Sequence, residues 1–332
     1  MPKTSQAQPA PPSYRYLFGP VASSRLGRSL GLDLLGGPIC SFDCVYCEVG
    51  RTKLHTCQRR AHVPASRLVQ ELRQWFKEGH QPPDYITLGG QGEPTLNSEL
   101  GTLVHQVRQQ WPTIPIAVLT NSSLLHREDV QEELAEVDAV LPSLDTLVDT
   151  EFHHLNRPCT GIDLSRISQG LLEFRRRYSG KIFLEILLVH GINDTAENKN
   201  RLREFIAEFS PQRVDVVTMT RPGAFSEARP IPNSILRSWR EALGACQDPV
   251  ARSSAPETHT TSPVHLDGQA IAATITNSLA RRPQTVDQLA FALNFARSDV
   301  AATLDALQNQ GTVVVLTGTD VPYYGLASSE RN

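Results

Sequence analysis

Short apolar runs alternate with amphipathic segments along most of the chain, and this alternation predicts the fold class. The predicted strands are residues 29–35, 85–88, 116–119, 139–144, 181–189 and 213–219. Segments with helical spacing of apolar residues lie between them, as at 164–178 and 196–209. Strands that alternate with helices are typical of parallel sheets joined by crossover helices. We therefore expect an α/β fold with a partial (β/α)6 barrel over residues 15–246.

One helix between two of these strands is predicted in detail at residues 67–78. Its apolar side chains recur on one face, and Gly79 is expected to end it. Ser66 precedes the first turn and is the expected N-cap.

The pattern changes after Cys246. Residues 247–267 are rich in Ser, Thr and Pro and lack apolar periodicity, so we expect a linker. Three helical segments and two short apolar runs follow, at 270–279, 285–292, 297–310, 312–317 and 321–325. This order is typical of a winged helix-turn-helix, which we expect over residues 268–328. The polar residues 1–14 are expected to form a disordered lead-in.

Composition and charge limit the classes of function. Of 332 residues, 40% are hydrophobic and 20% charged, which is typical of a globular protein. The formal net charge of −3 gives no general attraction to phosphate, so nucleic acid would need a local basic patch. No apolar run approaches the roughly 20 residues that span a bilayer, and the polar start lacks a signal-peptide core. We expect a cytoplasmic protein without membrane contact.

Three of the six cysteines fall within eight residues, in the spacing C-x3-C-x2-C. They are Cys40, Cys44 and Cys47. Thiolates are soft ligands that suit zinc or iron–sulfur clusters, and zinc sites usually use two C-x2-C pairs where this chain has one. Three cysteines leave one iron of a four-iron cluster free to bind a small molecule. The spacing therefore favours a [4Fe–4S] cluster. The scattered Cys57, Cys159 and Cys246 are interpreted as ordinary small residues.

The motif and the expected barrel resemble the radical S-adenosylmethionine (SAM) superfamily. The resemblance implies that SAM binds the free iron through its amino and carboxylate groups. An electron from the cluster would then cleave SAM to a 5′-deoxyadenosyl radical. Tyr46, the aromatic residue before the third cysteine, would approach the adenine.

A glycine-rich turn follows the next predicted strand and reads Gly-Gly-Gln-Gly-Glu-Pro over residues 89–94. Glycines there allow close backbone approach to a ligand, and the carboxylate of Glu93 can accept from an ammonium group. The segment resembles the Gly-Glu-Pro turn of the superfamily, which implies that Gly92 and Glu93 bind the methionine amino group.

Polar residues end two further strands, at the edge where barrel chemistry collects. Thr120 and Asn121 end the third strand, and Ser143 and Asp145 end the fourth. Their side chains can reach the cofactor carboxylate or ribose hydroxyls, or form turns. Glu185 either points into the barrel or pairs with an arginine in its wall.

Other candidates near this edge remain open between substrate contact and structural roles. Turn chemistry is slightly favoured for Asn193, Asp194 and Arg221. Basic residues on both sides of the cysteines, at 25–28 and 51–60, can contact the cofactor, an acidic electron donor or RNA phosphates, or lie on a solvated surface.

A longer match is found around the motif. Phe-Gly-Pro-Val-x3-Arg-Leu-Gly-Arg-Ser-Leu-Gly precedes the cysteines, and Gly-Gln-Gly-Glu-Pro-Thr-Leu follows. Both resemble the radical enzymes related to wybutosine synthesis on tRNA. Those enzymes hold a second cluster on upstream cysteines, and no cysteine precedes Cys40 here. We therefore expect a relative with one cluster.

The sequence is compatible with three functions. The favoured one is a radical SAM enzyme of oxidoreductase type that acts on an RNA base, a peptide or a metabolite. We expect a flavodoxin or ferredoxin as its electron donor, and the sequence assigns no catalytic residue. The second is a redox-sensing iron–sulfur regulator that binds DNA through the winged helix, and the third is a structural zinc protein. Asp299 and Asp305 in the predicted recognition helix disfavour DNA. A docking module or lid is the favoured role of that domain.

Overall fold

The computed structural model describes residues 14–246, 268–280, 282–293, 295–316 and 321–327, and its main feature is a seven-stranded sheet. The sheet contains β1 (Leu17–Ser23), β2 (Gly27–Asp33), β5 (Tyr85–Gly89), β6 (Ile116–Thr120), β7 (Ala139–Pro142), β8 (Lys181–Leu188) and β9 (Arg213–Thr218), in that order. Every neighbouring pair from β2 to β9 is parallel, and β1 is antiparallel to β2. The α/β class with a mainly parallel sheet is therefore confirmed.

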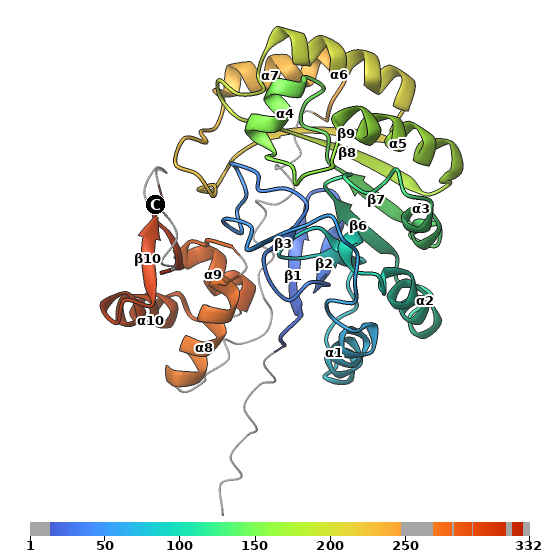
Figure 1. The fold of residues 1–332 in the computed structure, drawn as a ribbon. Helices are drawn as coiled ribbons and strands as arrows, with labels where there is room; N and C mark the ends of the chain where they lie inside the picture. Colours follow the sequence, from blue (N-terminus) through green and yellow to red (C-terminus); the bar gives the residue numbers. More distant parts are fainter. Residues whose placement is uncertain (1–13, 247–267, 281, 294, 317–320, 328–332) are drawn as a thin grey trace, which may run out of the picture.

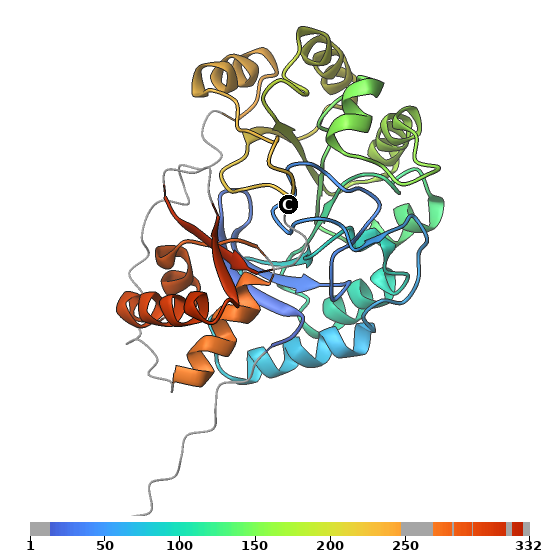
Figure 2. The same ribbon diagram turned by 60° about the vertical axis from the view of Figure 1, so that its left-hand side comes forward.

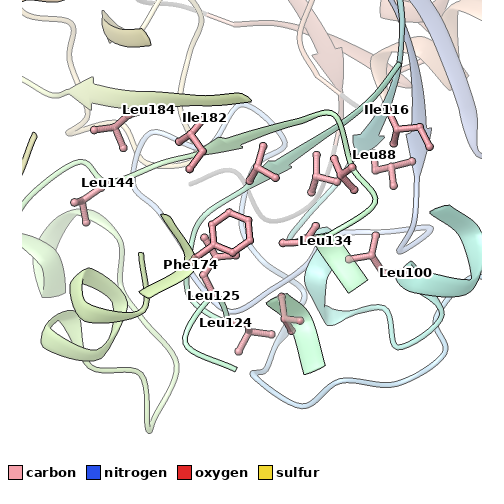
Figure 3. Close-up of a cluster of buried hydrophobic side chains, with 14 of the residues drawn as sticks. Leu88, Leu100, Ile116, Leu124, Leu125, Leu134, Leu144, Phe174, Ile182 and Leu184 are labelled. Carbon is pink, nitrogen blue, oxygen red and sulfur yellow. The ribbon is translucent and has the colours of Figure 1, made fainter. Parts of the chain in front are cut away.

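Helices cover the outer face of the curved sheet (Figure 1). They are α1 (Ala65–Lys77), α2 (Leu100–Gln110), α3 (Glu128–Leu134), α4 (Asp149–Leu155), α5 (Leu164–Arg177), α6 (Ala196–Phe209) and α7 (Asn233–Ala242), with a short 3-10 helix η1 at Pro94–Leu96. In Figure 3, Leu88, Ile116 and Ile182 from the strands face Leu134 and Phe174 from the helices. Burial of this apolar layer is the main stabilising contribution to the barrel.

The structure differs from the sequence prediction at two places. β1 was not among the predicted strands, and it tolerates proline because it is an edge strand with an irregular register. The predicted helix at 67–78 begins two residues earlier, at Ala65, and its N-cap is Pro64 rather than Ser66. A carboxylate from elsewhere in the chain replaces the cap, since Glu99 Oε2 accepts from the Ala65 N–H at 2.7 Å.

The C-terminal elements form their own apolar cluster. They are α8 (Gly268–Leu279), α9 (Val286–Leu293), α10 (Arg297–Asn309) and the antiparallel pair β10 (Val313–Leu316) and β11 (Tyr323–Leu326). Thr285 Oγ1 accepts from the Gln288 N–H at 3.2 Å and so caps the first turn of α9. The winged-helix assignment stays a prediction. The expected linker lies outside the described residues, and so does the expected lead-in except for its last residue, Tyr14. None of the described helices has the length and apolar character needed to cross a membrane.

The C-terminal elements lie beside β1 and β2 (Figure 2), where α9 contacts β1. On the inner side of the sheet, Arg25 in the β1–β2 turn forms an ion pair with Glu185 of β8. Of the two alternatives for Glu185, the pairing with an arginine is therefore the one found.

Asn97, which follows η1, provides a test of how buried polar groups hold this fold together. Its Nδ2 donates to the carbonyls of Leu34 and Val63 at 2.8 and 2.9 Å, and its Oδ1 accepts from the Glu99 N–H at 2.9 Å. Asn97→Ala leaves two buried carbonyls and one partly buried N–H without these partners, so we expect the free energy of unfolding to fall by about 3 kcal/mol. Urea denaturation measures this change.

The matched control is Asn200→Ala, an exposed asparagine on α6. We expect it to stay within about 0.5 kcal/mol of the wild type. Equal effects of the two substitutions would contradict the role given to Asn97.

Candidate functional site

Two short strands, β3 (Ile39–Cys40) and β4 (Leu54–His55), pair in parallel and enclose the cysteine loop. Cys40 ends β3, and Cys44 and Cys47 lie on the loop that follows. The Thr56 N–H donates to the Cys40 carbonyl at 2.9 Å. The Glu93 N–H, just after β5, donates to the Ile39 carbonyl at 3.1 Å. The cysteine loop is therefore fixed against the carboxyl edge of the sheet, where barrel chemistry collects.

Burial raises the pKa of all three thiols. The pKa of Cys40 is raised to about 12, first by burial and then by the charge of Glu93. Burial also raises the pKa of Cys44 and Cys47, and Cys44 feels the charges of both other cysteines. The thiols therefore bind their protons tightly, and a metal that takes thiolates must release those protons.

The three thiols interact with one another: Cys44 feels the charges of Cys40 and Cys47, and Cys40 feels the charge of Cys47. The cysteines of an iron–sulfur cluster bind different irons of one cluster. Three mutually interacting thiols on one loop fit the cluster.

Two asparagine amides donate to the cysteine sulfurs. Asn121 Nδ2 lies 3.4 Å from Cys40 Sγ and 2.9 Å from Ser41 Oγ. Asn156 Nδ2 lies 3.6 Å from Cys44 Sγ. Asn121 was predicted from its place at a strand end, but Asn156 was missed, because it is 112 residues from Cys44 and belongs to no motif. Hydrogen bonds to sulfur are one way in which proteins set a cluster potential.

Glu93 is almost fully buried and joins the ends of β5 and β6. Its Oε1 accepts from Thr95 N, Thr95 Oγ1 and Thr120 Oγ1 at 3.1, 2.6 and 2.7 Å, and its Oε2 accepts from Asn121 N at 2.6 Å. Burial raises the pKa of Glu93 although these donors lower it. Oε2 carries one of these four hydrogen bonds and so has capacity for another donor.

Gly92 approaches protein backbone closely. A Cβ atom at this position would stand 1.8 Å from the Ile39 carbonyl oxygen. Glycine is therefore required for the turn to pass the start of the cysteine loop.

Four of the predicted site residues line one small cavity next to the loop. They are Tyr46, Asn121, Ser143 and Asp145. The cavity holds about 20 Å³ of water-accessible space, enough for a single water molecule. Tyr46 Oη donates to Asp145 Oδ2 at 2.5 Å, and Asn156 Nδ2 donates to the same oxygen at 2.9 Å.

Asp145 is buried among donors and has a perturbed pKa. Its Oδ1 accepts from the Leu187 N–H at 2.9 Å. Burial raises its pKa to about 6, and the hydrogen bonds from Tyr46, Leu187 and Asn156 only partly offset that rise. The carboxyl group is thus poised to change its protonation near neutral pH.

Several open candidates have structural partners. Asn193 Oδ1 accepts from the Val189 N–H at 2.8 Å, and Asp194 Oδ1 accepts from the Gly191 N–H at 2.8 Å, so both form the turn after β8. Arg221 Nη1 pairs with Glu48, directly after the third cysteine, at 2.8 Å.

Comparisons with known proteins agree with this geometry. Residues 34–199 match the model of the Radical SAM superfamily. A UPF0026 protein of Methanocaldococcus jannaschii is 34% identical over 232 residues, which cover 68% of this chain and 72% of that protein. The radical SAM methyltransferase of Sphaerobacter thermophilus has a similar fold, with a TM-score of 0.51 at 17% identity, over 68% of this chain and 63% of that one.

A longer protein also matches. The GTPase Obg of Brachyspira hyodysenteriae is 31% identical over 300 residues. The match covers 90% of this chain and 43% of that protein, so this chain spans less than half of it. The present sequence contains no GxxxxGK[ST] segment of the kind that cradles nucleotide phosphates.

The pKa of Asp145 predicts a pH dependence of stability. Its value of about 6 in the folded protein lies above the ordinary 3.8, so the folded state binds this proton more tightly than the unfolded state. The tighter binding of this proton therefore adds to the free energy of unfolding. This contribution is fully present below about pH 4 and is lost as the pH rises through 6, by about 3 kcal/mol in total. Denaturation of the metal-free protein between pH 4 and 8 should show this fall in the wild type and not in Asp145→Asn.

Glu132→Gln, at an exposed carboxylate on α3, is the control and should keep the wild-type pH profile. Parallel pH profiles of wild type and Asp145→Asn would contradict the assignment.

Proposed function

Because this chain belongs to the radical SAM superfamily, we propose that it is an enzyme that reductively cleaves SAM and abstracts hydrogen from an organic substrate. The superfamily cofactors, a [4Fe–4S] cluster and SAM, are its cofactors. When bound, they supply a 5′-deoxyadenosyl radical. The observation that carries the proposal is the placement of three interacting thiols beside the carboxylate of Glu93, at the carboxyl edge of a parallel sheet.

The cysteines and Glu93 have complementary roles in this proposal. Cys40, Cys44 and Cys47 would hold three irons and leave the fourth for SAM. Glu93 acts electrostatically on Cys40 and is therefore close to it. Its Oε2 would accept from the amino group of SAM, a charge-assisted contact.

The cavity residues complete the proposed cofactor site. Tyr46, Gly92, Asn121, Ser143 and Asp145 are proposed to bind SAM. Asp145 and Ser143 offer acceptors for ribose hydroxyls, while Asn121 connects Glu93 to the sulfur of Cys40. Because the cavity holds little more than one water, Tyr46 would move off Asp145 when the nucleoside enters.

Guanidinium groups surround the cysteine loop and support an anionic partner. Arg51 and Arg157 stand over the Phe225 ring at 4.8 and 4.7 Å, and both lie near the single carboxylate of Asp43. These two arginines are partly exposed. They favour an acidic electron donor of the flavodoxin or ferredoxin type.

A second group of cations involves the C-terminal elements. Arg282 lies close enough to Arg221 and Glu48 to feel both charges. We propose that residues 15–246 form the catalytic barrel and that residues 268–328 form a winged-helix-like docking module or lid. Two cations, of which only Arg221 pairs with Glu48, favour a substrate with phosphate groups, such as an RNA nucleotide. This choice agrees with the resemblance to wybutosine-related enzymes.

The central experiment is anaerobic reconstitution with iron and sulfide, followed by dithionite and SAM. We expect bound iron and sulfide in cluster amounts and formation of 5′-deoxyadenosine. Replacing any of Cys40, Cys44 or Cys47 by Ala should abolish both, while Cys246→Ala should keep both. Reconstituted protein that holds an intact cluster but forms no 5′-deoxyadenosine would refute the proposed enzyme activity.

A second experiment tests Glu93. Glu93→Gln removes the charge, and we expect the Kd for SAM to rise about tenfold to a hundredfold with cluster content unchanged. Equilibrium dialysis of the reconstituted protein measures this.

Thr120→Val is the matched control, since it removes one donor to Glu93 and keeps the carboxylate. We expect its Kd to stay within about threefold of the wild type. If both variants lose affinity equally, hydrogen bonding rather than charge explains the effect.

A further inference from the structure

Cys57 and Cys159 lie on the two segments that flank the start of the cysteine loop. On one side, Cys57 directly follows Thr56, whose N–H bonds to the Cys40 carbonyl. On the other side, the Cys159 N–H donates to the Ser41 carbonyl at 2.9 Å, and Phe42 pairs antiparallel with Pro158. Two cysteines 102 positions apart in sequence are thus brought to opposite sides of one extended segment.

The two cysteines also lie near each other. Cys57 Sγ lies 3.9 Å from the carbonyl oxygen of Thr160, the neighbour of Cys159. Burial, and then the neighbouring Cys57 thiol, raise the pKa of Cys159 to about 12. Cys57 keeps part of its surface exposed, whereas Cys159 is buried.

We propose that Cys57 and Cys159 are a redox-active pair that closes reversibly into a disulfide across the base of the cysteine loop. The oxidant is a low-molecular-weight disulfide. The exposed Cys57 sulfur attacks one sulfur of the oxidant and releases one small thiol. The Cys159 sulfur then attacks Cys57 in the mixed disulfide and releases the second thiol, so two electrons and two protons pass from the pair to the oxidant.

The proposed disulfide would restrain the segment that starts the cysteine loop. Both flanking segments hydrogen-bond to consecutive carbonyls, those of Cys40 and Ser41. The Ser41 hydroxyl in turn lies 2.7 Å from Ser123 Oγ. A covalent link between the flanking segments therefore joins three neighbouring segments at the position where the first cluster ligand is held.

The test uses the reconstituted protein under anaerobic conditions, in buffers of reduced and oxidised glutathione. After acid quenching, alkylation and trypsin digestion, Cys57 falls in peptide 54–59 and Cys159 in peptide 128–166, while the clustered cysteines share peptide 29–51. We expect a cross-link between the first two peptides that disappears when reduced glutathione is restored.

Variants assign the order of the two steps. In Cys159→Ser we expect Cys57 to be trapped as a mixed disulfide with glutathione. In Cys57→Ser we expect Cys159 to remain a free thiol, because it is buried. Cys246→Ser is the control and should form the cross-link like the wild type.

Two results would overturn the proposal. One is wild-type protein in which Cys57 carries glutathione and no cross-link forms. The other is Cys159 reacting in Cys57→Ser as readily as Cys57 does in Cys159→Ser. The cross-link needs no cleavage of SAM, so its formation in protein that yields no 5′-deoxyadenosine supports this inference while refuting the proposed function.

Discussion

The buried carboxylate of Glu93 is the interaction on which the site depends. An ionised carboxylate is costly to bury unless donors satisfy it. Here Thr95 of η1 donates two hydrogen bonds, and Thr120 and Asn121 at the end of β6 donate one each. These bonds bring the ends of β5 and β6 together. Through the Glu93 N–H, the same residue fixes Ile39 at the start of the cysteine loop. The position of the first cysteine is thus coupled to two strands of the sheet.

Amide groups extend this coupling around the loop. Asn121 connects the Glu93 carboxylate to the sulfur of Cys40, and Asn156 connects the Asp145 carboxylate to the sulfur of Cys44. Each amide donates to sulfur from an element other than the cysteine loop. Residues at the end of β6 and directly after α4 therefore hold the loop in place and set the electrostatic surroundings of its thiols.

The sequence by itself determined the repeating pattern of the barrel and the spacing of its ligands. All six predicted parallel strands are present, and the bounds of α6 were predicted to the residue. These features are readable because apolar periodicity and the C-x3-C-x2-C spacing are local properties of the chain. The strand-end rule also located Asn121, Ser143 and Asp145, which line one cavity with Tyr46.

Only the tertiary structure decided which distant groups meet. Contacts between residues far apart in the chain leave no pattern in the sequence around either partner. Examples are the cap that Glu99 provides for Ala65, the pairing of Arg25 with Glu185, and the hydrogen bond from Asn156 to Cys44. Cys57 and Cys159 were each interpreted as an ordinary residue, because single cysteines carry little information. They come near each other because the segment after β4 and the segment after α4 both pack against the start of the cysteine loop. The clustered cysteines were readable from spacing alone, and their amide donors and the carboxylate beside them were set by packing between elements.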